Sequence, residues 1–152
     1  MAKKQYICKK EFFSMNKVFY LLMTLFLVCG TAYSATAQRV TDSSYRTVAN
    51  IKSDGTIQDA SYRTVGHIKS DGTIQDASYR TIGHLKSDGT VQDSSYRTVG
   101  HIKSDGTIQD SSYRTIGHVK SDGTVQDSSY KTIGHAKGIP MQWAAFYFFF
   151  SN

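Results

Sequence analysis

The chain has 152 residues, with 18 basic and 12 acidic side chains and a formal net charge of +6. Residues 1–37 carry five lysines and one glutamate, so residues 38–152 have 13 basic and 11 acidic side chains and a net charge of only +2. Basic and acidic residues are mixed along that part, which leaves no patch of one sign and argues against a nucleic-acid-binding protein. Cys8 and Cys29 both lie within residues 1–37, so disulfides cannot hold the remainder together.

Residues 1–37 are typical of a secretory signal peptide. A lysine precedes an apolar run of 11 residues at 18–28, and small residues follow up to an Ala-Thr-Ala sequence that ends at Ala37. This pattern predicts a secreted or periplasmic protein cleaved after Ala37, with Met15 as an alternative start. A transmembrane anchor is the other interpretation, but it needs roughly 20 apolar residues. Lipidation at Cys29 is disfavoured because a valine, not a small residue, precedes it.

Most of the remaining chain is one 17-residue unit repeated. A clean copy, SYRTIGHVKSDGTVQDS, runs from residue 112 to residue 128. Copies begin at Ser44, Ser61, Ser78, Ser95 and Ser112, and a truncated copy begins at Ser129. A unit of this size cannot bury a face by itself, so neighbouring units must stack or close into a ring.

Each unit is predicted to be a β-hairpin. In the second copy, residues 62–68 (YRTVGHI) are rich in aromatic and β-branched residues, which suit a strand. Residues 73–76 (TIQD) form a short second strand, and the Ser-Asp-Gly sequence at 70–72 between them favours a tight turn.

The register of the hairpin follows from its side chains. A three-residue loop with glycine at positive φ pairs Ile68 with Ile74 and His67 with Gln75, which places apolar side chains opposite apolar ones. The glycines expected at positive φ are Gly55, Gly72, Gly89, Gly106 and Gly123.

This register divides each hairpin into two faces. The face expected to form the core carries Tyr62, Thr64, Gly66, Ile68 and Ile74. The other face carries Arg63, Val65, His67, Lys69, Thr73 and Gln75, and it is polar except for Val65. An apolar residue recurs at the Val65 position, which indicates contact with the neighbouring unit or a bulge that turns it inward. Gly66 permits close backbone approach, but Ala49 replaces it in the first copy, so left-handed backbone is not required there.

Half-units at the two ends of the repeat region favour a closed ring. Residues 39–43 match a second strand and residues 129–137 match a first strand, so the two could pair and complete a sixth hairpin. Closure removes sheet edges, which otherwise promote aggregation. The sequence therefore predicts an all-β domain at 38–138, in which hairpin repeats form a closed radial arrangement. An open β-hairpin solenoid is the alternative.

Residues 139–152 depart from the repeat. Pro140 is followed by the apolar sequence WAAFYFFF at 143–150, which is too short for a membrane helix. As a strand it would be apolar on both faces and buried on both. We expect a C-terminal cap strand that plugs the hydrophobic ends of the hairpins. The alternatives are a contact between copies through Trp143–Phe150 and a membrane-contact patch.

Repeats of the form SYRTIGHVKSDGTVQDS behind a signal peptide, with the tail AKGIPMQWAAFYFFF, resemble the small exported β-flower proteins of Bacteroides-type bacteria. The resemblance covers Arg39 to Phe150. It implies an all-β domain whose hairpins form petals with pseudo-rotational symmetry. It implies no activity and no catalytic residues.

One histidine position recurs in the repeat and is a candidate metal site. It is occupied by His67, His84, His101, His118 and His135. In a ring these side chains could form a circle that binds a metal or responds to pH. Asn50 replaces the histidine in the first copy and no carboxylate accompanies it, so a polar outer-face role is favoured over a metal site.

One tyrosine position recurs in the same way and is a candidate ligand-binding site. It is occupied by Tyr62, Tyr79, Tyr96, Tyr113 and Tyr130, with Tyr45 at the start of the series. Exposed rings would offer flat platforms for sugars. Core packing is the favoured interpretation, because the tyrosine shares a predicted face with the Ile68 and Ile74 pair.

The chain lacks a phosphate-binding loop, a dinucleotide fingerprint and a nucleophile elbow. Every set of Ser, His and Asp is repeated identically, whereas a catalytic site needs one asymmetric constellation. We therefore expect no enzyme and no cofactor. The predicted function is an exported binding module for an envelope or extracellular polysaccharide. The alternative is a self-assembling structural or adhesive surface protein.

Overall fold

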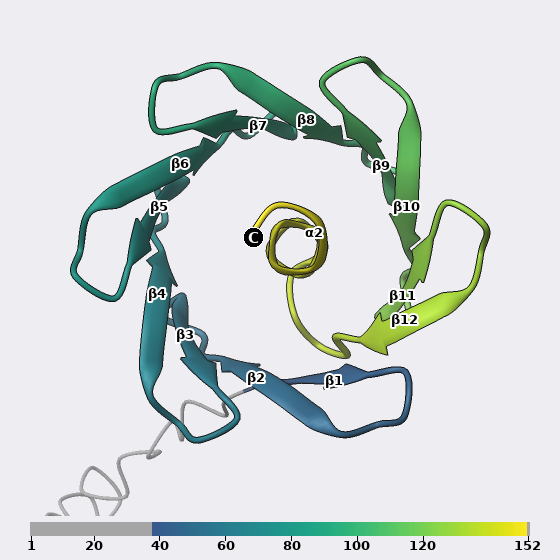
Figure 1. The fold of residues 1–152 in the computed structure, drawn as a ribbon, viewed down its shortest axis with the longest axis horizontal. Helices are drawn as coiled ribbons and strands as arrows, with labels where there is room; N and C mark the ends of the chain where they lie inside the picture. The colour runs from purple at the N-terminus through teal and green to yellow at the C-terminus, as the bar shows by residue number, and fades with distance from the viewer. Residues whose placement is uncertain (1–37, 152) are drawn as a thin grey trace, which may run out of the picture. The chain divides into compact units, whose positions relative to one another are not determined.

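The computed structural model describes residues 38–151, so the predicted signal peptide at 1–37 lies outside the described residues. Within residues 38–151, twelve antiparallel strands close into one ring, in which each strand pairs with two neighbours (Figure 1). The strands are β1 (Gln38–Asp42), β2 (Thr47–Ile51), β3 (Thr56–Asp59), β4 (Thr64–Ile68), β5 (Thr73–Asp76), β6 (Thr81–Leu85), β7 (Thr90–Asp93), β8 (Thr98–Ile102), β9 (Thr107–Asp110), β10 (Thr115–Val119), β11 (Thr124–Asp127) and β12 (Thr132–His135). The closed arrangement of hairpins is confirmed, and the open solenoid is wrong.

The two half-units at the ends of the repeat region close the ring as predicted. β1 pairs with β12, with Thr41 opposite His135 and Asp42 opposite Gly134. The same β1 strand pairs with β2 on its other side. No strand of the described ring therefore has a free edge, which removes the usual site of edge-to-edge aggregation.

The predicted hairpin register is also confirmed. Ile68 lies opposite Ile74, and His67 lies opposite Gln75. In the turn, the Gly72 N–H donates to the Lys69 carbonyl at 2.9 Å. Gly72 has a φ of 83°, and the four equivalent glycines, Gly55, Gly89, Gly106 and Gly123, lie in the same region.

A β-bulge on the other side of each first strand corrects the predicted faces. Gly66 lies opposite Ile57 and Thr64 lies opposite Gln58, so Val65 has no partner of its own. The extra residue shifts the alternation, which turns Val65 toward the interior of the ring with Gly66 and puts Thr64 on the outer face. The bulge considered for Val65 is thus confirmed, and the placement of Thr64 on the core face is wrong.

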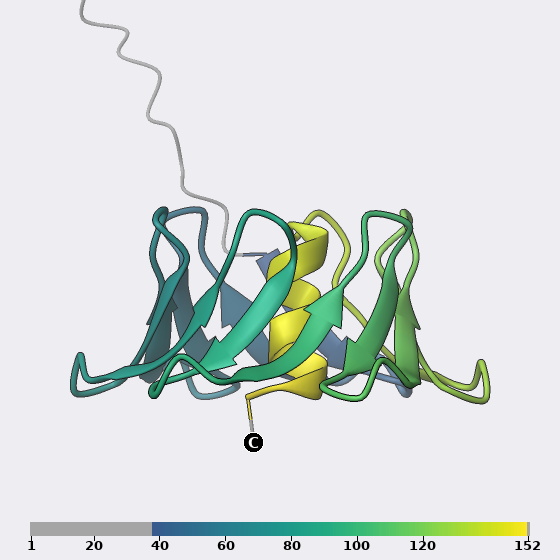
Figure 2. The ribbon, with the colours of Figure 1, turned by 90° about the horizontal axis from the view of Figure 1, so that it is seen from above.

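The two ends of the ring differ. The Ser-Asp-Gly turns lie together at a narrow end. The loops that contain the tyrosines spread outward at a wide end, and we call each such loop with the two strands that it joins, for example β5 and β6, a petal (Figures 1 and 2). Between the ends, two aliphatic side chains from each hairpin point inward, such as Ile68 and Ile74, which are 2% and 1% exposed. Burying each of these side chains contributes roughly 1.5–3 kcal/mol.

The predicted cap strand is wrong, because the tail is a helix. α2 (Met141–Phe149) passes through the middle of the ring, with Ala144, Ala145 and Phe146 buried (Figures 1 and 2). A closed ring offers no strand edge, so an apolar segment in its interior must satisfy its backbone hydrogen bonds internally, and a helix does this. The helix lies against β10 and β11. Among residues 38–151, no helix is both long and apolar enough to cross a membrane.

Three phenylalanines at the end of the tail explain three of the five glycines on the inner face, whereas a Cβ atom at Gly66 or Gly83 would come within 2.7 Å or 2.6 Å of a strand carbonyl oxygen. The rings of Phe148, Phe149 and Phe150 lie against Gly134, Gly117 and Gly100, respectively. A Cβ atom at Gly117 would come within 2.3 Å of the Phe149 ring and 2.6 Å of the Gln126 carbonyl oxygen. The inner glycines have ordinary φ angles, so they serve close approach and not left-handed backbone, as predicted.

Candidate functional site

The tyrosine loops have the same backbone as the Ser-Asp-Gly turns. The Asp76 N–H donates to the Arg80 carbonyl and the Tyr79 N–H donates to the Asp76 carbonyl, each at 3.0 Å. At the other end of β5, the Lys69 N–H donates to the Thr73 carbonyl and the Gly72 N–H donates to the Lys69 carbonyl, which is the same pattern. Tyr79 thus occupies the position that glycine occupies in the opposite turn, and its φ is 62°.

Six tyrosines share this left-handed conformation, with φ between 60° and 63°. We call them the tyrosine belt: Tyr45, Tyr62, Tyr79, Tyr96, Tyr113 and Tyr130. A left-handed φ costs a residue with a Cβ atom roughly 1–2 kcal/mol, which glycine would avoid. The loop geometry alone therefore gives no reason for tyrosine at this position.

An aspartate holds each of these loops in shape. Asp76 Oδ1 accepts the N–H groups of Ser78 at 2.8 Å and Arg80 at 3.0 Å, and Oδ2 accepts from Arg80 Nε at 2.8 Å. The backbone N–H of Arg80 is the largest cause that lowers the pKa of Asp76 below its usual value of 3.8. The Gln75 amide also donates to the Tyr79 carbonyl at 3.0 Å.

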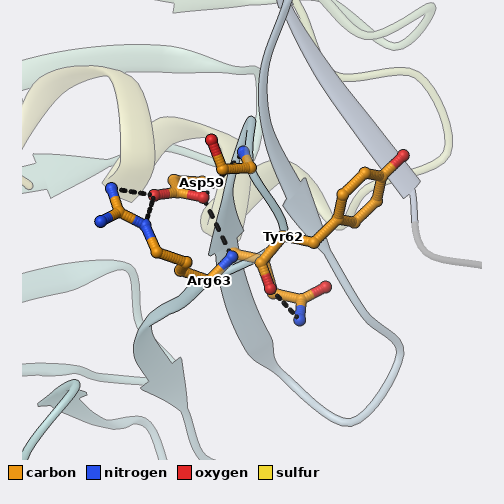
Figure 3. Close-up of polar contacts among 5 residues, drawn as sticks. Asp59, Tyr62 and Arg63 are labelled. Atoms are coloured by element: carbon orange, nitrogen blue, oxygen red, sulfur yellow. Dashed lines mark hydrogen bonds and ion pairs between the residues drawn. The ribbon is translucent and has the colours of Figure 1, made fainter.

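Figure 3 shows the same arrangement one repeat earlier. Asp59 accepts from Arg63, and the Tyr62 ring points away from these polar groups. The aspartates of these loops thus hold the backbone conformation of the tyrosines.

Most tyrosine rings stack on a histidine of the neighbouring petal. The rings of Tyr79, in the loop after β5, and His67, on β4, have centroids 4.8 Å apart and planes 13° apart. The other stacked pairs are Tyr45–His135, Tyr96–His84, Tyr113–His101 and Tyr130–His118, with centroids 4.4–4.6 Å apart. Tyr62 is the exception, because the histidine position beside it holds Asn50 and no ring of another described residue stacks on it.

The tyrosine rings lie outside the core, so the favoured core interpretation is wrong. The six side chains are 66–72% exposed. That interpretation continued strand alternation from Ile68 back to Tyr62, but the bulge at Val65 and the left-handed turn rotate the tyrosine to the outer face.

The five histidines are distributed around the outer face of the ring, each against its tyrosine. No group of three His, Cys, Asp or Glu residues within 38–151 is arranged to hold a metal ion. The structure therefore brings each predicted histidine together with a predicted tyrosine, and it does not bring the histidines together with one another.

A pocket at the narrow end was missed by the sequence reasoning. It has a volume of about 260 Å³ and lies between the first turn of α2 and the turns that follow β4 and β6. Its lining includes Ile68, Leu85, Trp143 and the two lysines Lys69 and Lys86. The pocket residues that come from the ring have the same sequence pattern as the equivalent residues of the other repeats. Only the position of the helix determines which turns form the pocket.

Comparison with known proteins identifies the fold but no activity. A family model described as "5-fold beta-flower protein" matches residues 37–152. The ring formed by residues 38–151 has six petals, one more than this description implies. No significant match was found among curated proteins or among solved structures.

Proposed function

The chain belongs to the 5-fold β-flower family, and from its own residues we propose that it is an exported, non-enzymatic module that binds polysaccharide through the tyrosine belt. The observation that carries the proposal is the exposure of six aromatic rings in left-handed backbone, where the fold itself would accept glycine. Backbone strain that persists in every repeat is a reason to look for a functional role.

The stacked pairs suit the flat faces of sugars. A pyranose ring presents an apolar face of C–H groups, which loses water when it packs on an aromatic ring and gains about 25 cal/mol for each Å² of apolar area buried. One face of Tyr79 is covered by His67, which holds the ring in place and leaves the other face for a ligand. A ring held in this way loses little conformational entropy on binding.

Hydrogen-bond donors for sugar hydroxyl groups lie in the same loops. The side chain of Arg80 is 80% exposed even though it pairs with Asp76 at 2.8 Å. A guanidinium has five N–H donors, and the contacts with the carboxylate leave some of them for a ligand. Each petal therefore offers an aromatic face beside a polar donor.

Six similar sites around one ring, five of them with a histidine stack, suit a repeating polymer. A single sugar ring on a single tyrosine binds weakly, but engagement of several petals by one chain can raise the overall affinity by roughly 10²–10⁴-fold. The proposal thus requires a polysaccharide and not a free monosaccharide at the belt.

The test is binding to a polysaccharide panel, on a glycan array and by depletion from solution, with tyrosines changed to glycine in increasing number. Glycine relieves the backbone strain at these positions, so the variants are expected to stay folded. The matched control changes Ser78, Ser95 and Ser112, the neighbouring loop residues, to alanine. Binding should fall stepwise with each tyrosine removed and stay unchanged in the control. A folded wild type that binds no glycan, or glycine variants that bind as well as wild type, would refute the proposal.

Self-assembly is a second candidate, favoured by apolar side chains at the wide end. Val65, Ile82 and Val99 are 37–45% exposed, whereas Ile116 and Ile133 at the same repeat position pack against the core. A second copy that docks on the wide end, beside the end of the tail, would cover the three exposed side chains. Sedimentation velocity should then show an oligomer that dissociates when Val65 and Ile82 are changed to threonine. A monomeric wild type at high concentration would contradict this candidate.

A further inference from the structure

The central helix breaks the symmetry of the ring. The turns of the narrow end are nearly identical in sequence, but α2 runs through the ring against β10 and β11 (Figure 1). The pocket of about 260 Å³ lies on the side of β4 and β6. A ring of near-identical repeats thus has a pocket formed by two particular turns.

The pocket combines an apolar floor with polar groups that lack partners. Ile68 and Leu85 are 2% and 6% exposed, and together with Trp143 they form the apolar part. Lys69 and Lys86 also line the pocket, and both are exposed. Neither lysine makes an ion pair or a side-chain hydrogen bond with another residue of the described range, and the same is true of the Trp143 indole N–H.

The lining residues carry a net positive charge. Asp71 is the acidic residue in the lining, and its Oδ1 already accepts the Thr73 N–H at 2.8 Å within the turn. The lining thus holds two lysines and one carboxylate, and Lys86 is also close enough to Asp88, just outside the lining, to help lower the pKa of that aspartate. The first turn of α2 contains no acidic residue, and its leading N–H groups point toward the N-terminal end of the helix, which adds to the positive potential.

We propose that this pocket binds a small molecule made of one ring and one carboxylate. The ring would pack between Trp143 and the aliphatic floor, and the carboxylate would lie between Lys69 and Lys86. Pockets for drug-sized ligands usually measure roughly 300–1,000 Å³, so the smaller volume here suits a single ring. Sugar acids and aromatic acids both have this chemistry. The site is separate from the tyrosine belt and does not depend on the polysaccharide proposal.

Trp143 makes the site directly measurable, because it is the only tryptophan of the chain. Titration of the purified protein with glucuronate and with benzoate should change its fluorescence and saturate for at least one of them. The acid that binds more tightly identifies the source of the ligand. The neutral analogues glucose and benzyl alcohol should bind at least tenfold more weakly, and added salt should weaken binding of the acid.

The repeat supplies a matched control for the lysines. The double variant Lys69→Gln and Lys86→Gln should weaken binding of the acid at least tenfold. The double variant Lys103→Gln and Lys120→Gln changes the same position in the turns after β8 and β10, outside the pocket, and should bind like wild type. All four lysines are exposed, so circular dichroism should show unchanged folding.

Three results would overturn the proposal. The first is a fluorescence signal that saturates with neither acid. The second is equal binding of acids and neutral analogues. The third is equal weakening by the two double variants, which would mean that the acid is attracted by the general charge of the narrow end and is not held in the pocket.

Discussion

Replacement of Tyr62 and of Tyr79 by glycine, one at a time, measures what the histidine stack contributes to the fold. Both residues have a φ of 62°, and their side chains are 68% and 67% exposed, so the two changes remove the same strain and nearly the same buried area. They differ in the partner, because Tyr79 stacks on His67 and Tyr62 lies beside Asn50.

The expected magnitudes follow from that difference. Relief of the left-handed φ stabilises the fold by roughly 1–2 kcal/mol, and the greater backbone entropy that glycine loses on folding offsets roughly 0.5–1 kcal/mol of this. Tyr62→Gly should therefore raise the free energy of unfolding by about 0–1.5 kcal/mol. Tyr79→Gly also loses an aromatic pair worth about 0.5–1.5 kcal/mol, so its net effect should be near zero or slightly destabilising.

Urea denaturation at neutral pH measures both values, provided that the slope against denaturant is unchanged. The His67→Asn change reproduces the surroundings of Tyr62, and in that background Tyr79→Gly should stabilise the protein as much as Tyr62→Gly does. The double-mutant cycle isolates the stack from the other effects. A coupling energy of zero, or a Tyr62→Gly variant as unstable as Tyr79→Gly, would show that the stack does not hold the tyrosine and that the strain argument fails.

Three further predictions concern the interior and the loops. Gly117→Ala should destabilise the protein by about 1–3 kcal/mol more than Gly66→Ala, as measured by urea denaturation, because the added Cβ meets the Phe149 ring only at Gly117. Phe146→Ala should lower the free energy of unfolding by about 3–5 kcal/mol in the same assay, since removal of this 5%-exposed side chain would leave a cavity at the centre of the strand ring. The loop aspartates, such as Asp71 and Asp76, have pKa values below 3.8, mainly because they accept backbone N–H bonds. Their contribution to stability should be complete above that pH and should be lost as the pH falls through the folded-state pKa, which a series of urea midpoints at decreasing pH will show.

The parts of the fold that depend on neighbouring residues were predictable. Ser-Asp-Gly turn chemistry and the alternation of Ile68 and Ile74 predict the hairpin, its register and the positive φ of Gly72. The matching half-units at residues 39–43 and 129–137 predict closure. Each of these inferences compares residues that are close in the repeat or identical between repeats.

The candidate site was only partly predictable. The recurrence of tyrosine and histidine at fixed positions identified both sets of residues, but their pairing joins Tyr79 to a histidine on the neighbouring petal. The outward position of the tyrosine depends on a bulge, which exists only where one hairpin pairs with the next. Nothing in the sequence around Lys69 and Lys86 distinguishes their turns from the others.

The 17-residue repeat thus specified its own hairpin and the ring that the hairpins close, because turn chemistry and side-chain alternation act over a few residues and recur without change. Assembly alone decided three features: the outer position of the tyrosines, the helical tail and the single-sided pocket. The physical reason is the closed ring itself. It offers the tail no strand edge, so the tail becomes a helix. Because this helix packs against one side of the ring, residues that are identical in sequence have different surroundings.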